Sequence, residues 1–153
     1  MPKHYEERTE NMKVGIIFGE FDLLHIGHLV MLEEAKRQCD HLIVGLKTDT
    51  PDSEQQDPRP TQTVVERFIK LEGCRYVDEI IPFESDEDLL DMLQSLPVDI
   101  RFVQEGITHF PGREYCLKEG IAIYYTKRKH RFTSDGLRSL VTEKEMMKAK
   151  LVK

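Results

Sequence analysis

Apolar runs of strand length alternate along the chain with segments whose apolar residues recur at helical spacing. The apolar runs occupy residues 14–18, 41–46, 76–81, 99–104 and 121–125, and each predicts a β-strand. Helical spacing and capping residues predict helices over residues 29–39, 64–74, 85–96 and 111–118, and from Thr133 or Ser134 toward residue 150. Strand and helix therefore alternate through the sequence.

This alternation is typical of a parallel β-sheet covered by helices on both faces. Because crossovers between parallel strands are right-handed, we expect an α/β, Rossmann-like, doubly wound fold with five parallel strands. We expect a polar extension over residues 1–12, one domain over residues 13–142, and a charged, partly frayed tail over residues 143–153. Residues 47–63, dense in Pro and Asp, predict a long surface loop.

Composition narrows the class of protein. The 153 residues carry a formal net charge of -6, which argues against general binding to nucleic acids or anionic membranes. The three cysteines, Cys39, Cys74 and Cys116, are far apart and lack zinc-site spacing, as expected of a reduced chain. The first dozen residues are polar, and no apolar run is long enough to span a bilayer. We therefore expect a cytoplasmic protein with no nucleic-acid or membrane partner.

The stretch GEFDLLHIGH, residues 19–28, lies between the first predicted strand and the first predicted helix. Doubly wound sheets bind ligands at the carboxyl ends of their strands, and backbone N–H groups in the first turn of a helix suit phosphate. His25 and His28 are three residues apart, so both imidazoles face the same ligand. Gly27 leaves out a side chain where backbone and ligand come close. The pattern indicates a nucleotide site.

Other interpretations of the histidine pair stay open at this point. The histidines could be ordinary core or surface residues, or the short H-x-G-H pattern could be a chance match. They could bind a metal ion with Asp22 as a third ligand, although no further His or Cys lies nearby at ligand spacing. Asp22 could instead cap the helix or hold the turn before it.

A basic run, KRKHR at residues 127–131, directly precedes the last predicted helix. Most basic runs are solvated surface segments. Here the run follows the fifth predicted strand and adjoins Thr133 and Ser134, whose hydroxyl and backbone N–H groups can bind phosphate oxygens. The position indicates binding of the outer phosphates of a nucleotide.

Three segments together resemble one enzyme family. GEFDLLHIGH is similar to the G-x-F-D-x-x-H-x-G-H motif of the cytidylyltransferase-like nucleotidyltransferases. RYVDEIIP, residues 75–82, resembles a second segment known in glycerol-3-phosphate cytidylyltransferases, and KRKHRFTSDGLR, residues 127–138, resembles in position a third, R-T-E-G-I-S-T-T. The letters HIGH also occur in class I aminoacyl-tRNA synthetases, which share the nucleotide site of this HIGH-type nucleotidyltransferase superfamily.

The resemblance implies transfer of CMP from CTP to a small polyol or sugar phosphate, glycerol 3-phosphate first among them, with release of pyrophosphate. It implies a Mg²⁺ ion that arrives with the triphosphate, and a homodimer. The residues implied in catalysis are His25, His28 and Arg128. Those implied in nucleotide binding are Gly19, Glu20, Phe21, Gly27, Glu105, Arg128, Thr133 and Ser134. Those implied in substrate binding are Arg59, Arg67 and Arg75.

Some of these assignments have alternatives. Arg67 could be an exposed helix residue, and Arg75 could pair with Asp78 or Glu79. The sequence also departs from the family at Glu20, in the acidic loop 49–57, at residues 104–106 and at Asp135. These departures leave two other functions open: an ATP-dependent adenylyltransferase acting on a sugar or pantetheine phosphate, or a nucleotide-binding homologue without catalysis.

Overall fold

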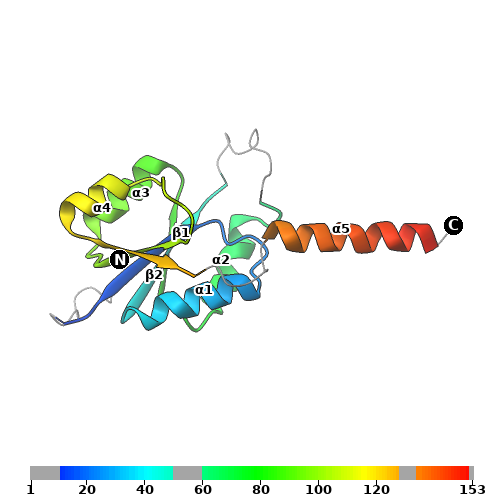
Figure 1. Ribbon diagram of the computed structural model, residues 1–153, viewed down its shortest axis with the longest axis horizontal. Coiled ribbons are helices and arrows are strands. Elements are labelled where there is room, and N and C mark those ends of the chain that lie inside the picture. Colours follow the sequence, from blue (N-terminus) through cyan, green and yellow to red (C-terminus); the bar gives the residue numbers. More distant parts are fainter. Residues whose placement is uncertain (1–10, 50–59, 128–133, 152–153) are drawn as a thin grey trace.

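The computed structural model describes residues 11–49, 60–127 and 134–151. Within these ranges the strands are β1 (Val14–Gly19), β2 (His41–Lys47), β3 (Glu79–Phe83), β4 (Ile100–Gln104) and β5 (Ala122–Thr126). The helices are α1 (Ile26–Arg37), α2 (Val64–Glu72), α3 (Asp86–Ser95), α4 (Arg113–Glu119) and α5 (Ser134–Leu151). The predicted alternation of strand and helix is confirmed (Figure 1).

The strands form one parallel sheet in the order β3-β2-β1-β4-β5. The chain starts in the central strand β1, adds β2 and β3 on one side, and then crosses to add β4 and β5 on the other. Ile16 of β1 lies opposite Ile43 of β2 and Arg101 of β4. The strand order thus reverses between β1 and β4, and a doubly wound sheet binds its ligand at such a reversal.

Two apolar layers cover the two faces of the sheet. Leu32 of α1 and Leu71 of α2 pack with Leu42 of β2 in one layer, while Leu93 of α3 and Cys116 of α4 belong to the other. Successive side chains of a strand point to opposite faces, so a strand covered on both sides must be apolar throughout. Burial of each leucine contributes about 2 kcal/mol, and the two layers hold the strand ends in register.

The position of β3 differs from the prediction. Pro82 was expected to end this strand, but β3 continues through it to Phe83. β3 is an edge strand that pairs only with β2, and an edge strand tolerates a proline because one side of it needs no hydrogen-bond donors. The strand prediction over residues 76–81 was therefore about three residues too early.

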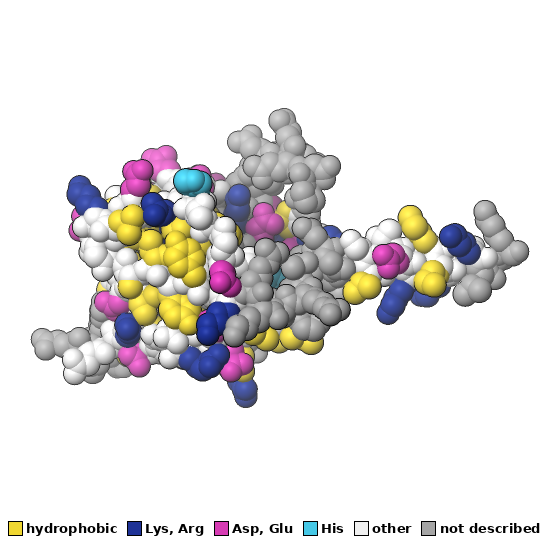
Figure 2. Space-filling view, viewed as in Figure 1, with side chains coloured by type: hydrophobic (Ala, Val, Ile, Leu, Met, Phe, Trp, Pro, Cys, Tyr) yellow, Lys and Arg dark blue, Asp and Glu magenta, His cyan; other side chains and the backbone are white. Residues whose placement is uncertain are grey.

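Helix α5 extends away from the body of the molecule, and the C-terminus lies at its far end (Figure 1). It is continuous to Leu151, so the expected fraying is not observed over residues 143–151. Figure 2 shows apolar, acidic and basic side chains exposed along it; the large apolar ones are Leu140, Val141, Met146 and Met147. Across the described ranges, no helix combines the length and the hydrophobicity needed to cross a membrane.

Candidate active site

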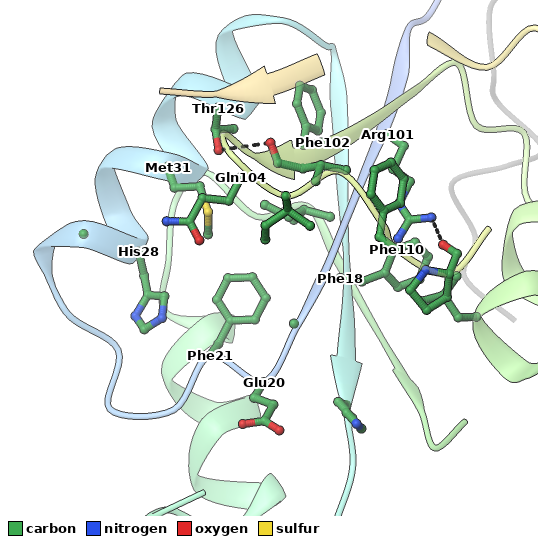
Figure 3. Close-up of a pocket in the computed structure, with 18 of the residues that line it drawn as sticks. Phe18, Glu20, Phe21, His28, Met31, Arg101, Phe102, Gln104, Phe110 and Thr126 are labelled. Carbon is green, nitrogen blue, oxygen red and sulfur yellow. Dashed lines mark hydrogen bonds between the residues drawn. The ribbon is translucent and has the colours of Figure 1, made fainter. Parts of the chain in front are cut away.

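A pocket of about 530 Å³ opens at the carboxyl ends of the strands, beside the point where the strand order reverses. The ends of β4 and β5 contribute Gln104, Thr126 and Lys127 to its lining. Figure 3 shows Phe21 inside the pocket with the His28 ring beside it. Six residues predicted for the site line it: Gly19, Glu20, Phe21, His25, Gly27 and His28.

The two histidines cap the first turn of α1. Nδ1 of His25 accepts a hydrogen bond from the backbone N–H of Gly27 at 3.0 Å, and Nδ1 of His28 accepts one from the backbone N–H of His25 at 3.2 Å. This is a capping box in which imidazoles replace the usual Ser or Thr and Glu or Gln. The rings are stacked, with centroids 4.0 Å apart. The cap therefore fixes both side chains at the helix N-terminus.

These hydrogen bonds also fix the proton on each imidazole. An Nδ1 atom that accepts from a backbone N–H carries no proton, so the proton of the neutral ring is on Nε2. Nε2 lies on the side of the ring away from the cap, and both rings line the pocket. His25 and His28 can therefore donate from Nε2 to an anion that enters the pocket, next to the positive end of the α1 dipole.

The loop between β1 and α1 has an unusual backbone. Phe21 and Leu23 both have a φ of 50°, a left-handed conformation that is uncommon for residues with large side chains and costs roughly 1–3 kcal/mol each. Phe21 is buried with its ring centroid 5.5 Å from that of His28. The backbone N–H of Leu23 donates to Oε1 of Gln62 at 3.0 Å. These contacts hold the loop as a wall of the pocket.

Asp22, in the middle of this loop, is 3 % exposed. Its carboxylate accepts hydrogen bonds from the backbone N–H groups of Thr61 at 2.7 Å and Gln62 at 2.9 Å, and from the guanidinium of Arg138 in α5. Burial alone raises the pKa of Asp22, but these three donors outweigh it and hold the pKa below its usual value.

Asp22 therefore holds the turn before α1, one of the two structural roles considered from the sequence. It does not complete a metal site with the histidines in this arrangement, because its oxygens are taken up by donors from the α2 entry and α5. Across residues 11–49, 60–127 and 134–151, no cluster of three or more His, Cys, Asp or Glu residues is placed to hold a metal ion.

Arg67 is completely buried and does not line the pocket itself, but it contacts two residues that do. Its Nη1 donates to the backbone carbonyls of Glu20 at 2.8 Å and Lys47 at 2.7 Å. Its Nε donates to the carbonyl of Gln62 at 3.2 Å, and its Nη2 to the Asp49 carboxylate at 2.8 Å. The alternative of an exposed helix residue is wrong. The guanidinium ties the ends of β1 and β2 to α2, so it positions pocket residues, and direct substrate contact by Arg67 stays a prediction.

The exit of β5 is fixed by a buried carboxylate from α1. Glu34 accepts hydrogen bonds from the backbone N–H of Lys127, at 3.2 and 3.1 Å to its two oxygens, and from the Tyr124 hydroxyl at 3.1 Å. Burial and the neighbouring Glu34 raise the pKa of Tyr124. Lys127, the first residue of the basic run, is thereby held where it lines the pocket.

The structure does not bring every predicted residue to the pocket. Glu105 is exposed and follows β4, and its neighbour Gln104 lines the pocket instead. Arg75 precedes the amino end of β3, whereas the pocket lies at the carboxyl ends of the strands. It donates to the Tyr76 hydroxyl at 2.9 Å rather than to an acidic neighbour. Substrate contact by Arg75 stays a prediction that this pocket does not support.

Some predictions fall on residues outside the described ranges. Arg59, Arg128 and Thr133 are among them, and Ser134 is described only as the first residue of α5. Their roles in binding or catalysis stay predictions.

The sequence analysis missed three charged residues of the pocket, Lys47, Asp86 and Arg101. Arg101, the second residue of β4, lines the pocket together with Phe18 and Phe110 and is 4 % exposed. The strand sequence IRFVQ could have indicated Arg101, because an arginine is rarely buried in an apolar parallel strand unless it has a binding partner.

Comparisons with known proteins agree with this geometry. The profile of the cytidylyltransferase-like family matches residues 16–147. Glycerol-3-phosphate cytidylyltransferase of Bacillus spizizenii is 33% identical over 135 residues, which cover 88% of this chain and 98% of that protein. The bifunctional protein HldE of Caulobacter vibrioides is 39% identical over 94 residues, 61% of this chain, but the match spans only 19% of that longer protein.

A crystal structure supports the fold as well. The lipopolysaccharide core biosynthesis protein from Thermoplasma volcanium superposes with a TM-score of 0.62 at 22% identity, covering 76% of this chain and 95% of that one. The chain belongs to the cytidylyltransferase-like family, since that family's profile matches most of its length. The fold and the family expected from the sequence are both confirmed.

Proposed function

We propose that the chain is a nucleotidyltransferase that transfers CMP from CTP to a small polyol or sugar phosphate. An oxygen of the acceptor phosphate attacks the α-phosphorus, a new P–O bond forms, and the bond from the α-phosphorus to the bridging oxygen breaks. Pyrophosphate leaves with the electron pair. The product is a CDP-linked acceptor, and no covalent enzyme intermediate is needed.

The observation that carries this proposal is the hydrogen-bonded pair of His25 and His28 at the N-terminus of α1. The cap leaves each Nε2–H as the donor on the pocket side. Negative charge grows on the α-phosphate and on the leaving pyrophosphate, so fixed donors aimed at these oxygens stabilise the transition state more than the ground state. Removing one such donor typically costs about a hundredfold or more in rate.

Further positive charge supports the same function. Lys127 lines the pocket at the end of β5, held there by Glu34, and we propose that it and Arg128 bind the β- and γ-phosphates. Mg²⁺ enters as part of the Mg·CTP substrate, because it commonly binds through phosphate oxygens and water with few protein ligands. Thr133, Ser134 and Arg59 are proposed to contact the phosphates and the acceptor.

Glycerol 3-phosphate is the first acceptor to test, because the relative of that name matches over nearly its full length. We also propose a cytoplasmic homodimer, as the family resemblance implies; light scattering of the purified chain measures the mass directly.

The test is pyrophosphate release by the purified chain with Mg²⁺, using CTP or ATP and a panel of acceptors that includes glycerol 3-phosphate and several sugar phosphates. The proposal expects release with CTP and at least one acceptor. Release with ATP alone would replace it with an adenylyltransferase. Tight triphosphate binding by calorimetry without release from any pair would instead indicate a homologue that binds nucleotide without catalysis.

A further inference from the structure

Arg101 brings a buried positive charge into the wall of the pocket. It is the second residue of β4, lies opposite Ile16 of β1, and is 4 % exposed. Figure 3 shows Arg101, Phe18 and Phe110 on one side of the pocket and His28 on the other, with Phe21 between them. The charge therefore lies away from the histidine pair, on the side of the pocket formed with α3 and the entry to α4.

Aromatic rings and a backbone carbonyl fix the Arg101 guanidinium. Its central carbon is 5.0 Å from the ring centroid of Phe18 and 4.5 Å from that of Phe110, and Nη1 donates to the carbonyl of Pro111. Gly112 has a φ of 81°, and a Cβ there would come within 2.9 Å of Nη1. A side chain at position 112 would therefore collide with the Arg101 guanidinium. Glycine leaves room for the guanidinium, which these contacts hold in one place.

The positive charge of Arg101 is not balanced by the described residues. Across residues 11–49, 60–127 and 134–151, no carboxylate lies within 4.0 Å of its guanidinium nitrogens. Its Nε is buried without a hydrogen-bond acceptor. A buried cation without a counter-charge is costly, and a buried unsatisfied donor adds to that cost. Burial lowers the pKa of Arg101, which reports the same unfavourable desolvation. An anionic ligand in the pocket would supply the missing counter-charge.

The surroundings indicate what the rest of that ligand looks like. Phe83 and Leu89 give this side of the pocket apolar walls, and Asp86, the exposed first residue of α3, also lines it. A carboxylate there repels an anion but accepts hydrogen bonds from hydroxyl groups. The apolar walls and this hydrogen-bond acceptor suit a hydroxylated carbon chain whose acidic end reaches the Arg101 guanidinium rather than Asp86.

We propose that Arg101 binds an acidic group, a carboxylate or a second phosphate, at the end of the acceptor remote from the reacting phosphate. The inference rests on the proposed nucleotidyl transfer and narrows its acceptor to a phosphorylated hydroxy acid or a bisphosphorylated polyol. The reacting phosphate stays near His25 and His28, and the acidic end selects the acceptor. An aminoalcohol phosphate binds less well at Arg101, because its ammonium group would meet the buried guanidinium.

The test compares the binding of three acceptors by calorimetry in the absence of CTP, so that no transfer reaction can occur. Glycerol 3-phosphate and 3-phosphoglycerate differ only by a hydroxymethyl against a carboxylate, and ethanolamine phosphate carries an ammonium. The wild type should bind 3-phosphoglycerate at least about tenfold more tightly than glycerol 3-phosphate, and ethanolamine phosphate least well. Arg101→Gln should remove the preference for the carboxylate, and Arg101→Lys should keep part of it.

Arg113→Gln is the matched control, because it removes an exposed arginine of the neighbouring helix that does not line this pocket. It should keep the preference of the wild type. A wild type that binds 3-phosphoglycerate no better than glycerol 3-phosphate, or does not bind it, overturns the inference, even if Arg101→Gln fails to fold. The proposed transfer reaction fails separately, by the absence of pyrophosphate release, since acceptor binding is measured without turnover.

Discussion

The Arg138 guanidinium of α5 is ion-paired with the buried Asp22 carboxylate, 116 residues earlier in the chain. Nε of Arg138 also donates to the Thr61 hydroxyl at 3.2 Å. Because Asp22 lies in the loop that leads to His25, the contact joins the last described helix to the wall of the pocket. The position of this loop therefore depends on α5 as well as on the sheet.

Replacing Asp22 should lower stability in a way that depends on pH. The folded-state pKa of Asp22 lies below its usual value of 3.8, so the carboxylate stabilises the fold fully above about that pH, and this contribution is lost as the pH falls through the folded pKa. Asp22→Asn should reduce the free energy of unfolding at pH 7 by roughly 2 kcal/mol. Urea unfolding between pH 7 and pH 3 measures the difference, which should shrink toward the acid end.

Arg138→Gln is the companion variant. Its effect and that of Asp22→Asn should not add in the double variant, because both remove the same pair. Additive effects would show that Arg138 and Asp22 act independently, and an unchanged gap between wild type and Asp22→Asn at acid pH would contradict a lowered pKa.

Two substitutions of His25 can separate the helix cap from the chemistry. Asparagine is a good N-cap residue whose Oδ1 can take the place of Nδ1, but it has no group at the position of Nε2. His25→Asn should therefore keep thermal stability close to that of the wild type and lose about a hundredfold or more in kcat. His25→Ala should lose the rate and also about 1 kcal/mol of stability. Thermal unfolding and steady-state kinetics on the same samples measure both effects.

His28→Gln offers the same comparison at the second histidine, because glutamine at this position keeps the reciprocal capping contact. An asparagine or glutamine variant that is as stable and as fast as the wild type would contradict the role assigned to the Nε2–H donors.

Arg67 should be intolerant even of lysine. A lysine ammonium cannot reach the four acceptors that the planar guanidinium contacts at once. Arg67→Lys should lower the free energy of unfolding by about 3 kcal/mol. It should also raise KM, because the carbonyls of Glu20 and Lys47 lose the hydrogen bonds that position these two pocket residues. Arg37→Lys, at an exposed site of α1, is the control and should change stability by less than about 0.5 kcal/mol. A small effect at Arg67 would contradict its positioning role.

Glu34 should matter through Lys127 rather than through contact with substrate. Glu34→Gln keeps one acceptor oxygen, whereas Glu34→Ala removes both acceptors of the Lys127 N–H and leaves the Tyr124 hydroxyl without this partner. Glu34→Ala should raise KM for the triphosphate several-fold, and the raised pKa of Tyr124 should move back toward 10.0. Spectrophotometric titration of the tyrosines, with Tyr124→Phe as reference, measures that pKa. An unchanged KM would show that Lys127 does not bind phosphate.

Most of the fold follows from local sequence signals. The apolar runs predict the strands because both faces of a parallel sheet are covered, and Ser85 predicts the start of α3 through its capping box with Asp88. Thr63 caps α2 in the same way, because its side chain accepts a hydrogen bond from the backbone N–H of Glu66. β3 was misplaced because the effect of Pro82 depends on whether its strand lies at an edge, and strand order is not a local property.

The site divides in the same way. GEFDLLHIGH was predicted because a strand, a helix start and the histidine pair are adjacent in sequence. The contacts that hold the loop within this stretch were not predicted. Asp22 is held by the backbone N–H groups of Thr61 and Gln62, and the sequence does not show which backbone groups a side chain will contact. Arg67 was assigned to substrate binding from the family resemblance. Its burial was not predicted, because three of its acceptors belong to residues 20, 47 and 49, far from it in sequence.

The most direct test of the account is a ³¹P NMR measurement of the products formed from Mg·CTP and an acceptor panel by the wild type and by His28→Gln. Equal amounts of pyrophosphate and a CDP-linked acceptor from the wild type, and neither at a comparable rate from a folded His28→Gln, are the predicted result. Formation of CDP or CMP with free acceptor, or full activity of the variant, would contradict the account.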